Sequence, residues 1–308
     1  MAILEVRGLE LTLTRSMRGF RRQEVKVLDG LDLQVEAAGI TAVVGASGSG
    51  KSLLAHAVLG ILPEEAKLEG ELLYKGEPLT LQRQEELRGR EIVLVPQSVS
   101  YLNPTMRVGR QVRGVHLDKE KQRVKQRQAF ARYGLSQETE RLYPFELSGG
   151  MARRVLLAAA TISEAQLIIA DEPTPGLPQE GVQEALNHLR ELADEGSGVL
   201  LITHDIAAAL TVADRIVVFY AGTSVEAARA SDFAGGGEAL RHPYSRALWQ
   251  ALPQNGFQTL PGVQPLPHER PQGCHFAPRC PMATEECAAA RPNRRELRGG
   301  WVRCFHAT

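Results

Sequence analysis

A glycine-rich loop, G-A-S-G-S-G-K-S at 45–52, holds the residues whose types and spacing point most directly to a chemical role. It follows an apolar run and precedes a helical stretch, so a bound anion would meet backbone N–H groups and the positive end of a helix dipole. Lys51 offers a positive charge to the β- and γ-phosphates of a nucleotide, and Ser52 offers a hydroxyl to Mg²⁺. The loop therefore predicts a site for a nucleoside triphosphate. Its other expected contacts to the phosphates are Gly45, Ser47, Gly48 and Gly50.

Two acidic residues end a second apolar run, L-I-I-A-D-E at 167–172. Asp171 could hold the Mg²⁺ shell, and Glu172 could act as general base on an attacking water. Two acids in this place could also merely cap the end of a strand. The phosphate loop upstream favours the first interpretation, which predicts hydrolysis of the nucleotide.

The elements that must position these residues alternate between short apolar runs and helical stretches. Continuous apolar runs are typical of strands buried on both faces of a mainly parallel sheet. Helical stretches at 51–60 and 179–195 lie between them, so the sequence predicts an α/β fold. The runs lie at 3–6, 40–45, 91–97, 166–172, 198–204 and 215–222.

Composition shifts along the chain predict two domains. Residues 98–160 form a polar, helical segment, and we interpret its charge-rich part at 118–134 as a solvated helix face. We place an ATPase-type domain at 1–233, with the helical subdomain inserted in it. The tail at 234–308 begins with a run of three glycines and becomes rich in Pro, Arg and Cys, so we expect a small appended domain with little regular structure.

The overall charge and hydropathy limit the partners of the chain. Its 308 residues carry 36 Lys and Arg against 36 Asp and Glu, and this balance argues against nucleic acid as the main partner. The first residues lack the basic and apolar segments of a signal peptide, and no apolar run approaches the roughly 20 residues of a membrane helix. We therefore expect a soluble, cytosolic protein that reaches a membrane only through partners.

The pentapeptide L-S-G-G-M at 147–151 lies between the phosphate loop and the acidic strand, and this combination resembles the ATP-binding cassette (ABC) ATPases. The resemblance covers residues 1–230 and implies a P-loop NTPase cassette with a RecA-like core and a helical subdomain. Gln97 matches the Q-loop glutamine that contacts Mg²⁺, and His204 matches the switch histidine near the γ-phosphate. Phe20 could be the aromatic residue that stacks on adenine, although any core phenylalanine would fit as well.

The signature segment of this family completes the ATP site of a second subunit. The resemblance therefore implies a dimer that ATP closes and hydrolysis opens. Ser148 and the amides of Gly149 and Gly150 would then donate to the γ-phosphate across the interface. The D-loop region, E-P-T-P-G-L-P at 172–178, has Pro178 where the family usually has Asp. Because that Asp helps to couple the two sites, we expect a non-identical ATPase partner.

Three further segments resemble the ATPases of oligopeptide, dipeptide and nickel importers. They are P-Q-S-V-S-Y-L-N-P-T-M-R-V-G-R-Q-V at 96–112, the signature helix L-S-G-G-M-A-R-R-V, and H-P-Y-S-R-A-L at 242–248. The resemblance implies a peripheral ATPase on the cytoplasmic side of the membrane. It would work with two permeases and, indirectly, with an extracytoplasmic binding protein. Those partners would choose the cargo, whether peptide, nickel or another metal chelate.

Two other classes of function stay open at this point. A soluble cassette ATPase could act on ribosomes or nucleic acid, but such proteins often carry a second cassette or a coiled-coil or basic insertion, and this chain has neither. A regulatory protein could bind nucleotide without turnover. The intact set Lys51, Asp171, Glu172 and His204 argues against that class, and Pro178 leaves some room for it.

All four cysteines lie in the last part of the tail, with the spacing C-x5-C-x6-C-x16-C. In a cytosolic protein such a cluster favours a metal site over disulfides. Some of the relatives that the chain resembles hold a [4Fe–4S] cluster with four such cysteines. A zinc site with four thiolates and a set of free cysteines are the alternatives, and the C-x2-C pairs of zinc ribbons are absent. The four are Cys274, Cys280, Cys287 and Cys304.

Overall fold

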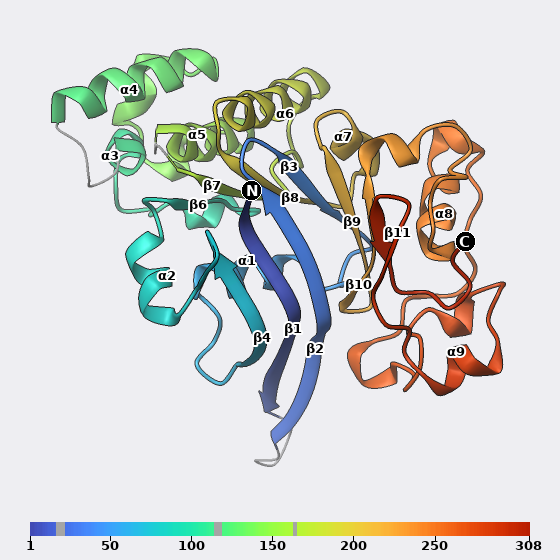
Figure 1. Ribbon diagram of the computed structural model, residues 1–308. Helices are drawn as coiled ribbons and strands as arrows, with labels where there is room; N and C mark the ends of the chain where they lie inside the picture. The colour runs from blue at the N-terminus through green and yellow to red at the C-terminus, as the bar shows by residue number, and fades with distance from the viewer. Residues whose placement is uncertain (17–21, 114–118, 163–164) are drawn as a thin grey trace.

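The structure is a computed structural model, and it describes residues 1–16, 22–113, 119–162 and 165–308. Two β-sheets form its centre, with helices between them and on the outer face of the larger sheet (Figure 1). Phe20, the expected adenine-stacking residue, lies outside the described residues.

Among the described residues, the larger sheet has eight strands: β3 (Ile40–Val44), β6 (Ile92–Val95), β7 (Leu167–Asp171), β8 (Gly198–Thr203), β9 (Arg215–Tyr220), β10 (Thr223–Arg229), β11 (Arg295–Leu297) and β12 (Gly300–Val302). Their order is β11-β12-β10-β9-β3-β8-β7-β6, and the five strands from β9 to β6 run parallel. Every residue of β3, β7 and β8 is buried, because both faces of this part of the sheet are covered. The parallel strands are those that the apolar runs from residue 40 onward predict.

The smaller sheet is antiparallel and has the strands β1 (Ala2–Ser16), β2 (Arg22–Glu36), β4 (Lys67–Tyr74) and β5 (Glu77–Pro78), in the order β2-β1-β4-β5. The apolar run at 3–6 belongs to β1, which differs from the parallel sheet expected for it. Leu4 and Val6 are buried, whereas Glu5 is partly exposed and Arg7 is exposed. This alternation places one face of β1 in the core and the other in water, as in many antiparallel sheets.

Two apolar layers cover the larger sheet. On one face, Val43 packs in a cluster with Leu54 of a helix that lies between the two sheets. On the other face, Val44 packs in a cluster with Leu156 and Leu186 of two outer helices. Neighbouring strand residues point to opposite faces, which is why Val43 and Val44 belong to different layers. The helices are α1 (Lys51–Leu59) between the sheets, and α5 (Gly149–Ile162), α6 (Gln179–Asp194) and α7 (Ile206–Leu210) on the outer face.

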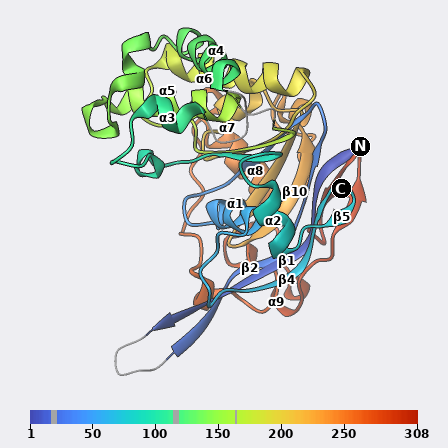
Figure 2. The same cartoon turned by 90° about the vertical axis from the view of Figure 1, so that its left-hand side faces the viewer.

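The helical segment expected at 98–160 projects from one end of the larger sheet (Figures 1 and 2). Its charge-rich part forms a helix that buries Gln126 and Phe130 and exposes Arg123 and Arg127, which agrees with a solvated face. The β1–β2 hairpin extends from the opposite end of the molecule (Figure 2). The helices of the segment at 98–160 are α3 (Val108–Arg113) and α4 (Lys119–Arg132), followed by α5, and α2 (Leu81–Leu87) precedes this segment.

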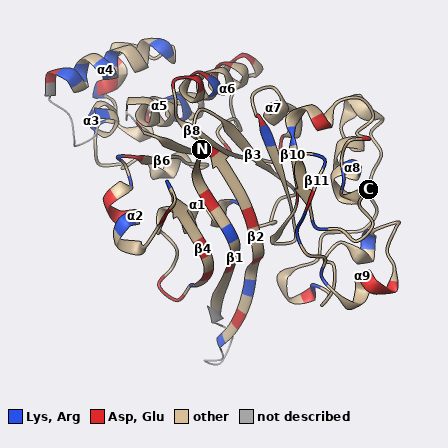
Figure 3. Cartoon of the chain, in the orientation of Figure 1, with Lys and Arg blue, Asp and Glu red and all other residues tan. Residues whose placement is uncertain are grey.

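The C-terminal region adds the helices α8 (Pro243–Gln250) and α9 (Glu285–Ala289) and the two strands β11 and β12. β12 pairs with β10 at Glu226↔Val302 and Ala227↔Trp301, so the tail extends the sheet of the ATPase-type core. The division at 233/234 stays a prediction, because these pairs join residues from both of its sides. Lys and Arg are interspersed with Asp and Glu along β1, β2 and α4 (Figure 3), as the balanced composition suggests. Within the described residues, no helix is both long and apolar enough to cross a bilayer.

Candidate nucleotide site

The glycine-rich loop links the end of β3 to the start of α1, as expected. Gly45 has φ 155°, and a Cβ there would lie 2.3 Å from the carbonyl oxygen of Phe219. Gly50 has φ 99°, and a Cβ there would lie 2.5 Å from Cδ2 of Leu28. Any side chain at either position would clash, so glycine is required for the loop to lie against β9 and β2. Gly48 and Ser47 are exposed, which leaves this part of the loop open to a ligand.

Lys51 is buried at the first position of α1 and turns back over the loop. Its Nζ donates to the carbonyl oxygens of Gly45 at 2.8 Å and Ala46 at 3.1 Å. Burial lowers the pKa of Lys51, and the negative charges of Glu172 and Asp171 partly oppose that shift. A phosphate group beside the ammonium would therefore find a cation that lacks full solvation.

Ser52 and Asp171 bring together two oxygen ligands from distant parts of the chain. The Ser52 hydroxyl donates to Oδ1 of Asp171 at 3.2 Å. Burial raises the pKa of Asp171, and the hydrogen bond from Ser52 opposes that rise. Gln97 is exposed two residues after β6, which runs parallel to β7, so it lies at the same sheet edge as Asp171. Hydroxyl, carboxylate and amide oxygens are ligands that suit Mg²⁺.

Glu172 is held by the end of the neighbouring strand β8. Its Oε1 lies 2.8 Å from Nδ1 of His204 and accepts the His204 backbone N–H at 3.1 Å. Its Oε2 accepts the Thr203 hydroxyl at 3.3 Å. The carboxylate is therefore buried but fixed, while the His204 side chain is 62% exposed. The parallel pairing of β7 and β8 explains how residues more than thirty positions apart meet here.

The signature segment lies at the start of α5. The Ser148 hydroxyl accepts the backbone N–H of Met151 at 3.2 Å, and Gly149 and Gly150 form the first turn of the helix. A Cβ on either glycine would meet no atom within 4 Å. No described residue therefore requires glycine there, and Gly149 is exposed at the surface.

Arg153 is a further residue of this region that the sequence alone did not single out. It is buried in α5, where Nη1 donates to the Pro96 carbonyl at 3.0 Å and Nη2 to the Pro175 carbonyl at 3.3 Å. Burial lowers its pKa, and the charge of Glu172 opposes that shift. Arg153 thus joins the residue before Gln97 to the D-loop region. An arginine on the buried side of an apolar helix is the only sequence signal that could have indicated it.

Pro178 ends the D-loop region and directly precedes α6. Its φ of −64° and ψ of 159° are ordinary for proline, and its carbonyl accepts the Val182 N–H at 3.0 Å. The ring therefore fits the start of the helix without strain. It offers no side-chain hydrogen-bonding group at the position where the family usually has Asp.

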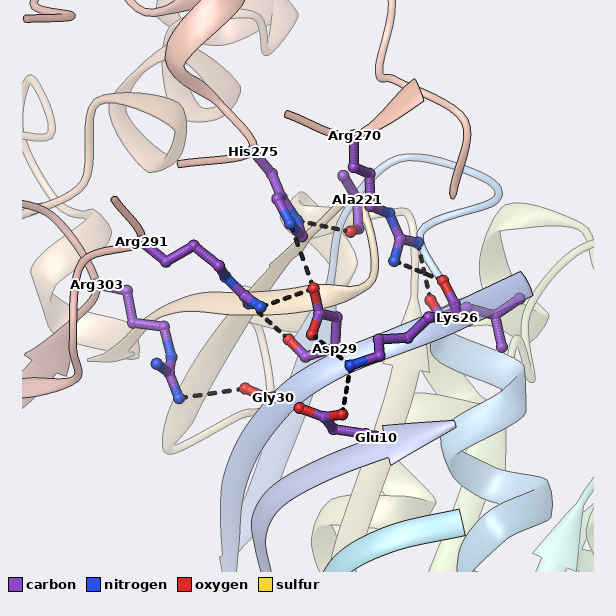
Figure 4. Close-up of polar contacts among 10 residues, drawn as sticks. Glu10, Lys26, Asp29, Gly30, Ala221, Arg270, His275, Arg291 and Arg303 are labelled. Atoms are coloured by element: carbon purple, nitrogen blue, oxygen red, sulfur yellow. Dashed lines mark hydrogen bonds and ion pairs between the residues drawn. The ribbon is translucent and has the colours of Figure 1, made fainter. Parts of the chain in front are cut away.

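Side chains of the C-terminal region form ion pairs and hydrogen bonds with the part of β2 that lies behind the phosphate loop (Figure 4). Asp29 lies 2.7 Å from Nη1 of Arg291 and 3.4 Å from Nε2 of His275. Arg270 donates to the carbonyls of Lys26 and Val27, at 2.9 Å each. Burial alone would raise the pKa of Asp29, but hydrogen bonds from His275 and Arg291 lower it far below its ordinary value.

The four cysteines gather in the C-terminal region, where each of three thiols has its pKa raised by burial. Nearby backbone N–H groups partly oppose the rise in pKa of Cys274, Cys280 and Cys304. Cys287 lies 3.3 Å from Nε2 of His306, and its carbonyl accepts the Cys274 N–H at 2.8 Å. Within the described residues, no three His, Cys, Asp or Glu side chains lie close enough to hold one metal ion.

A cavity of about 840 Å³ lies away from these groups, beside the first residues of β7 and β8. Two of the charges in its lining are paired, Lys75 with Glu91 and Arg132 with Glu191. Parallel strands carry their functional groups at their carboxyl ends, and this cavity lies at the other edge. We therefore assign the chemistry to the phosphate loop.

Comparison with known families gives two matches. The family described as ABC transporter matches residues 28–175, and the family described as oligopeptide/dipeptide transporter, C-terminal region, matches residues 225–287. Solved structures are similar in fold. A dimeric bacterial ABC transporter cassette has a TM-score of 0.64 at 23% identity, covering 74% of this chain and 98% of that one. A nucleotide-free cassette from an ABC transporter has a TM-score of 0.60 at 23% identity, covering 74% and 92%. The expected P-loop cassette fold is confirmed.

Relatives are similar over nearly the whole length. The dipeptide transport ATP-binding protein DppD of Haemophilus influenzae is 33% identical over 324 residues, 99% of this chain and 95% of that protein. DppD of Escherichia coli is 35% identical, covering 97% and 95%, and the oligopeptide transport ATP-binding protein AppD of Bacillus subtilis is 31% identical, covering 98% and 96%. With such identity along its length, the chain belongs to the ATP-binding subunits of ABC transporters, and its cassette is an ATPase.

Proposed function

We propose that this chain hydrolyses ATP to power the import of peptides through partner permeases. The observation that carries the proposal is the pair of contacts beside the phosphate loop, Ser52 with Asp171 and Glu172 with His204. Ser52 and Asp171 offer metal ligands, and Glu172 offers a base that His204 holds in place. These groups are the minimum set for attack of water on a phosphate. The match to the oligopeptide/dipeptide transporter region favours transport over a soluble role on ribosomes or nucleic acid.

Each residue then has a distinct task in hydrolysis. Lys51 leaves the carbonyls of its own loop and turns to the β- and γ-phosphates. Glu172 takes a proton from the attacking water, and His204 keeps the carboxylate aimed from the end of β8. Loop amides from Ser47 to Gly50 donate to the phosphate oxygens at the start of α1.

Mg²⁺ fits the oxygen set at this edge. Bound there, it would supply positive charge that neutralises part of the charge of the phosphates. Ser52, Asp171 and Gln97 would hold it, since all three lie at the carboxyl ends of β-strands or the start of α1. Burial of Asp171 favours an arriving cation, because the carboxylate has lost part of its solvation.

The signature segment would serve the ATP of a second subunit. Its amides and the Ser148 hydroxyl lie at an exposed helix start, and the open space at Gly149 and Gly150 allows close approach of a phosphate. A cassette of similar fold forms a dimer in its structure with ADP and phosphate. Pro178 makes a non-identical partner the better candidate, since the coupling Asp is missing from this chain.

Peptides are the favoured cargo, because the relatives given above are named as dipeptide or oligopeptide transport proteins. Nickel or another metal chelate comes second and rests only on the resemblance of sequence segments. The ATPase would sit on the cytoplasmic side of the membrane against two permeases, and an extracytoplasmic protein would deliver the cargo.

A [4Fe–4S] cluster is the metal group that best fits the four cysteines. Each thiolate of such a cluster binds a separate iron, so the sulfurs need not converge on one ion as they would for zinc. Backbone N–H donors at Cys274, Cys280 and Cys304 would stabilise thiolates. Anaerobic purification with absorption near 400 nm and iron and zinc analysis tests this. A colourless, metal-free protein would rule out both metals.

Uptake by cells that carry the whole complex tests the proposed function. Labelled dipeptides and Ni²⁺ are supplied in parallel, with Lys51→Ala as the inactive control. We expect dipeptide uptake that the control abolishes, and Ni²⁺ uptake at the background level. Uptake of neither, or uptake that survives Lys51→Ala, would contradict the proposal.

A further inference from the structure

His275 of the C-terminal region has no task in the mechanism above, yet both nitrogens of its buried ring have partners (Figure 4). Nδ1 lies 3.1 Å from the Ala221 carbonyl oxygen, and Nε2 lies 3.4 Å from Oδ2 of Asp29. A carbonyl oxygen can only accept a hydrogen bond, so Nδ1 carries a hydrogen and donates it to Ala221. Within the described residues, this carbonyl has no second donor. His275 therefore holds one edge of the peptide group that joins Ala221 to Gly222.

Ala221 and Gly222 form the tight turn between β9 and β10. Both have a positive φ, 44° and 78°, as in the two-residue turns of many hairpins. A residue with a side chain rarely adopts this conformation, which persists only where surrounding contacts hold it. Asp29 supplies a second such contact, because its backbone N–H donates to the Gly222 carbonyl at 2.8 Å. The turn is therefore held in place by the C-terminal region and by β2.

The other edge of the same peptide group faces the phosphate loop. The Gly222 N–H donates to the Ser49 carbonyl at 3.2 Å. A peptide group is planar and trans, so its carbonyl and its N–H point in opposite directions. The Ala221 carbonyl points to His275, and the Gly222 N–H points to Ser49. By fixing the carbonyl, His275 also fixes the direction in which the N–H meets the loop.

The peptide group that joins Ser49 to Gly50 continues this chain of hydrogen bonds. Ser49 is only 1% exposed, so its carbonyl cannot exchange the Gly222 N–H for bulk water. The Gly50 N–H belongs to the same planar group and therefore points away from the turn. It is one of the loop amides proposed above to donate to phosphate oxygens. Hydrogen bonds thus run from His275 through two peptide groups to this amide, and bonds in such a chain polarise one another.

We propose that His275 is a positioning residue for ATP binding. Through the Ala221–Gly222 and Ser49–Gly50 peptide groups, it orients and polarises the Gly50 N–H that meets the phosphates. The proposal rests on ATP binding at the phosphate loop. It gives the C-terminal region, which lies outside the ABC transporter match at 28–175, a part in holding the nucleotide.

Two substitutions at this one position separate the donor from the rest of the ring. In His275→Asn the side-chain amide can take the place of Nδ1, so the bond to Ala221 is kept and the contact with Asp29 is lost. In His275→Gln the amide reaches the place of Nε2, so the contact with Asp29 is kept and the donor to Ala221 is lost. MgATP is titrated into the purified full chain of each variant by calorimetry. KM and kcat are measured on the assembled complex.

His275→Gln should weaken MgATP binding roughly three- to ten-fold, because one hydrogen bond of the chain is removed. KM should rise by a similar factor, while kcat stays within about two-fold, since Glu172 and the proposed metal ligands are unchanged. His275→Asn should bind MgATP within two-fold of wild type. Both substitutions lie beside Cys274, so an effect on the cysteines is common to the two variants. MgATP affinity of His275→Gln within two-fold of wild type, or an equal loss in His275→Asn, would overturn the proposal.

Hydrogen exchange in the wild type tests the same chain of bonds without a variant. The Gly222 amide should exchange slowly without nucleotide, and more slowly once MgATP is bound, because the Ser49–Gly50 peptide group is then held from both sides. Fast exchange at Gly222, or exchange that MgATP leaves unchanged, would overturn the proposal even if both variants failed to fold. A wild-type chain that binds no MgATP would instead refute the ATPase assignment, and the proposal with it.

Discussion

Glu172 shows how single residues are prepared for chemistry in this protein. Its φ of 48° is unusual for a residue with a side chain and costs on the order of 1 kcal/mol or more. The strain persists because its N–H donates to the Ile202 carbonyl at 2.8 Å and its carboxylate is held by Thr203 and His204. The backbone is bent just where the strand ends, and the bend turns the carboxylate toward β8 and the switch histidine.

Glu172→Gln is expected to lower kcat by at least about 100-fold, because a general base contributes roughly that much or more. MgATP affinity should stay within a few-fold of wild type, since the amide keeps the size of the side chain. Steady-state hydrolysis and nucleotide titration on the assembled complex measure both. Glu180→Gln, at an exposed acid in the first turn of α6, is the control. Full turnover in the Glu172 variant would refute its role as base.

Asp29 gives a prediction about pH. Its pKa in the folded chain lies below the ordinary value of about 4, so the unfolded chain binds more protons in that range. The contact therefore stabilises fully above that value and is lost as the pH falls toward the folded pKa. Asp29→Asn should lower the free energy of unfolding by about 1–3 kcal/mol at neutral pH, because it removes the negative charge that faces His275 and Arg291.

Denaturant titration between about pH 7 and pH 3 checks this prediction. The difference between Asp29→Asn and wild type should shrink toward the acid end. Asp194→Asn, whose partner Arg190 lies on the surface of α6, should change stability by less than about 1 kcal/mol throughout. A constant difference for Asp29→Asn at every pH would show that the residue acts through its shape and not through its charge.

At the scale of elements, α5 connects three parts of the site. Its start carries Ser148, and its middle carries Arg153, which bonds the carbonyls of Pro96 and Pro175. Those carbonyls flank Gln97 and the D-loop region. We therefore expect a shift of α5 to move both loops together, which would link the signature segment to the residues proposed to hold Mg²⁺.

Arg153→Ala should lower kcat of the assembled complex several-fold. It should also lower the free energy of unfolding by about 1–3 kcal/mol, because two hydrogen bonds to carbonyl groups are lost at a buried position. Arg154→Ala is the matched control. Its guanidinium donates to the carbonyls of Tyr133 and Gly134, which directly follow α4, and at 3.4 Å to the Gly150 carbonyl of its own helix. ATP hydrolysis rates of the two variants are compared in the assembled complex. An equal fall in rate in both variants would refute a specific link through Arg153.

At the scale of the whole molecule, the site depends on chain segments far beyond the cassette motifs. β2, behind the phosphate loop, is bonded by three residues of the C-terminal region, Arg270, His275 and Arg291. β12 of the same region extends the larger sheet. The signature segment, by contrast, faces outward from α5. This arrangement supports the proposal that the chain holds one nucleotide and presents its signature segment to another.

The incompleteness of the site predicts a requirement for a partner. The purified chain alone should hydrolyse ATP at well under a tenth of the rate of the assembled complex, since general electrostatic and positioning contributions from the other subunit are missing. Steady-state hydrolysis with and without the second ATPase subunit measures this. Equal rates would contradict the expected non-identical dimer. Pro178→Asp, which restores the usual family residue, should raise the activity of the chain alone.

The sequence by itself determined the elements whose signals are local. The glycine-rich loop follows β3, the acids end β7, and the buried strands from residue 40 onward coincide with continuous apolar runs. Glycine spacing and unbroken apolar character leave few alternatives within a short segment. The run at 3–6 was less decisive, because its alternation with Glu5 and Arg7 becomes clear only over the whole length of β1.

Tertiary structure alone decided which distant residues support the site. Gly45 lies against Phe219, Arg153 bonds the carbonyls of Pro96 and Pro175, and Tyr244 lines one cavity with Ala46, about two hundred residues away along the chain. The tail likewise joins the central sheet where its composition suggested a separate unit. Local patterns record which backbone a segment prefers, but contacts between remote segments depend on how the whole core packs, and that packing leaves no mark in any one stretch of sequence.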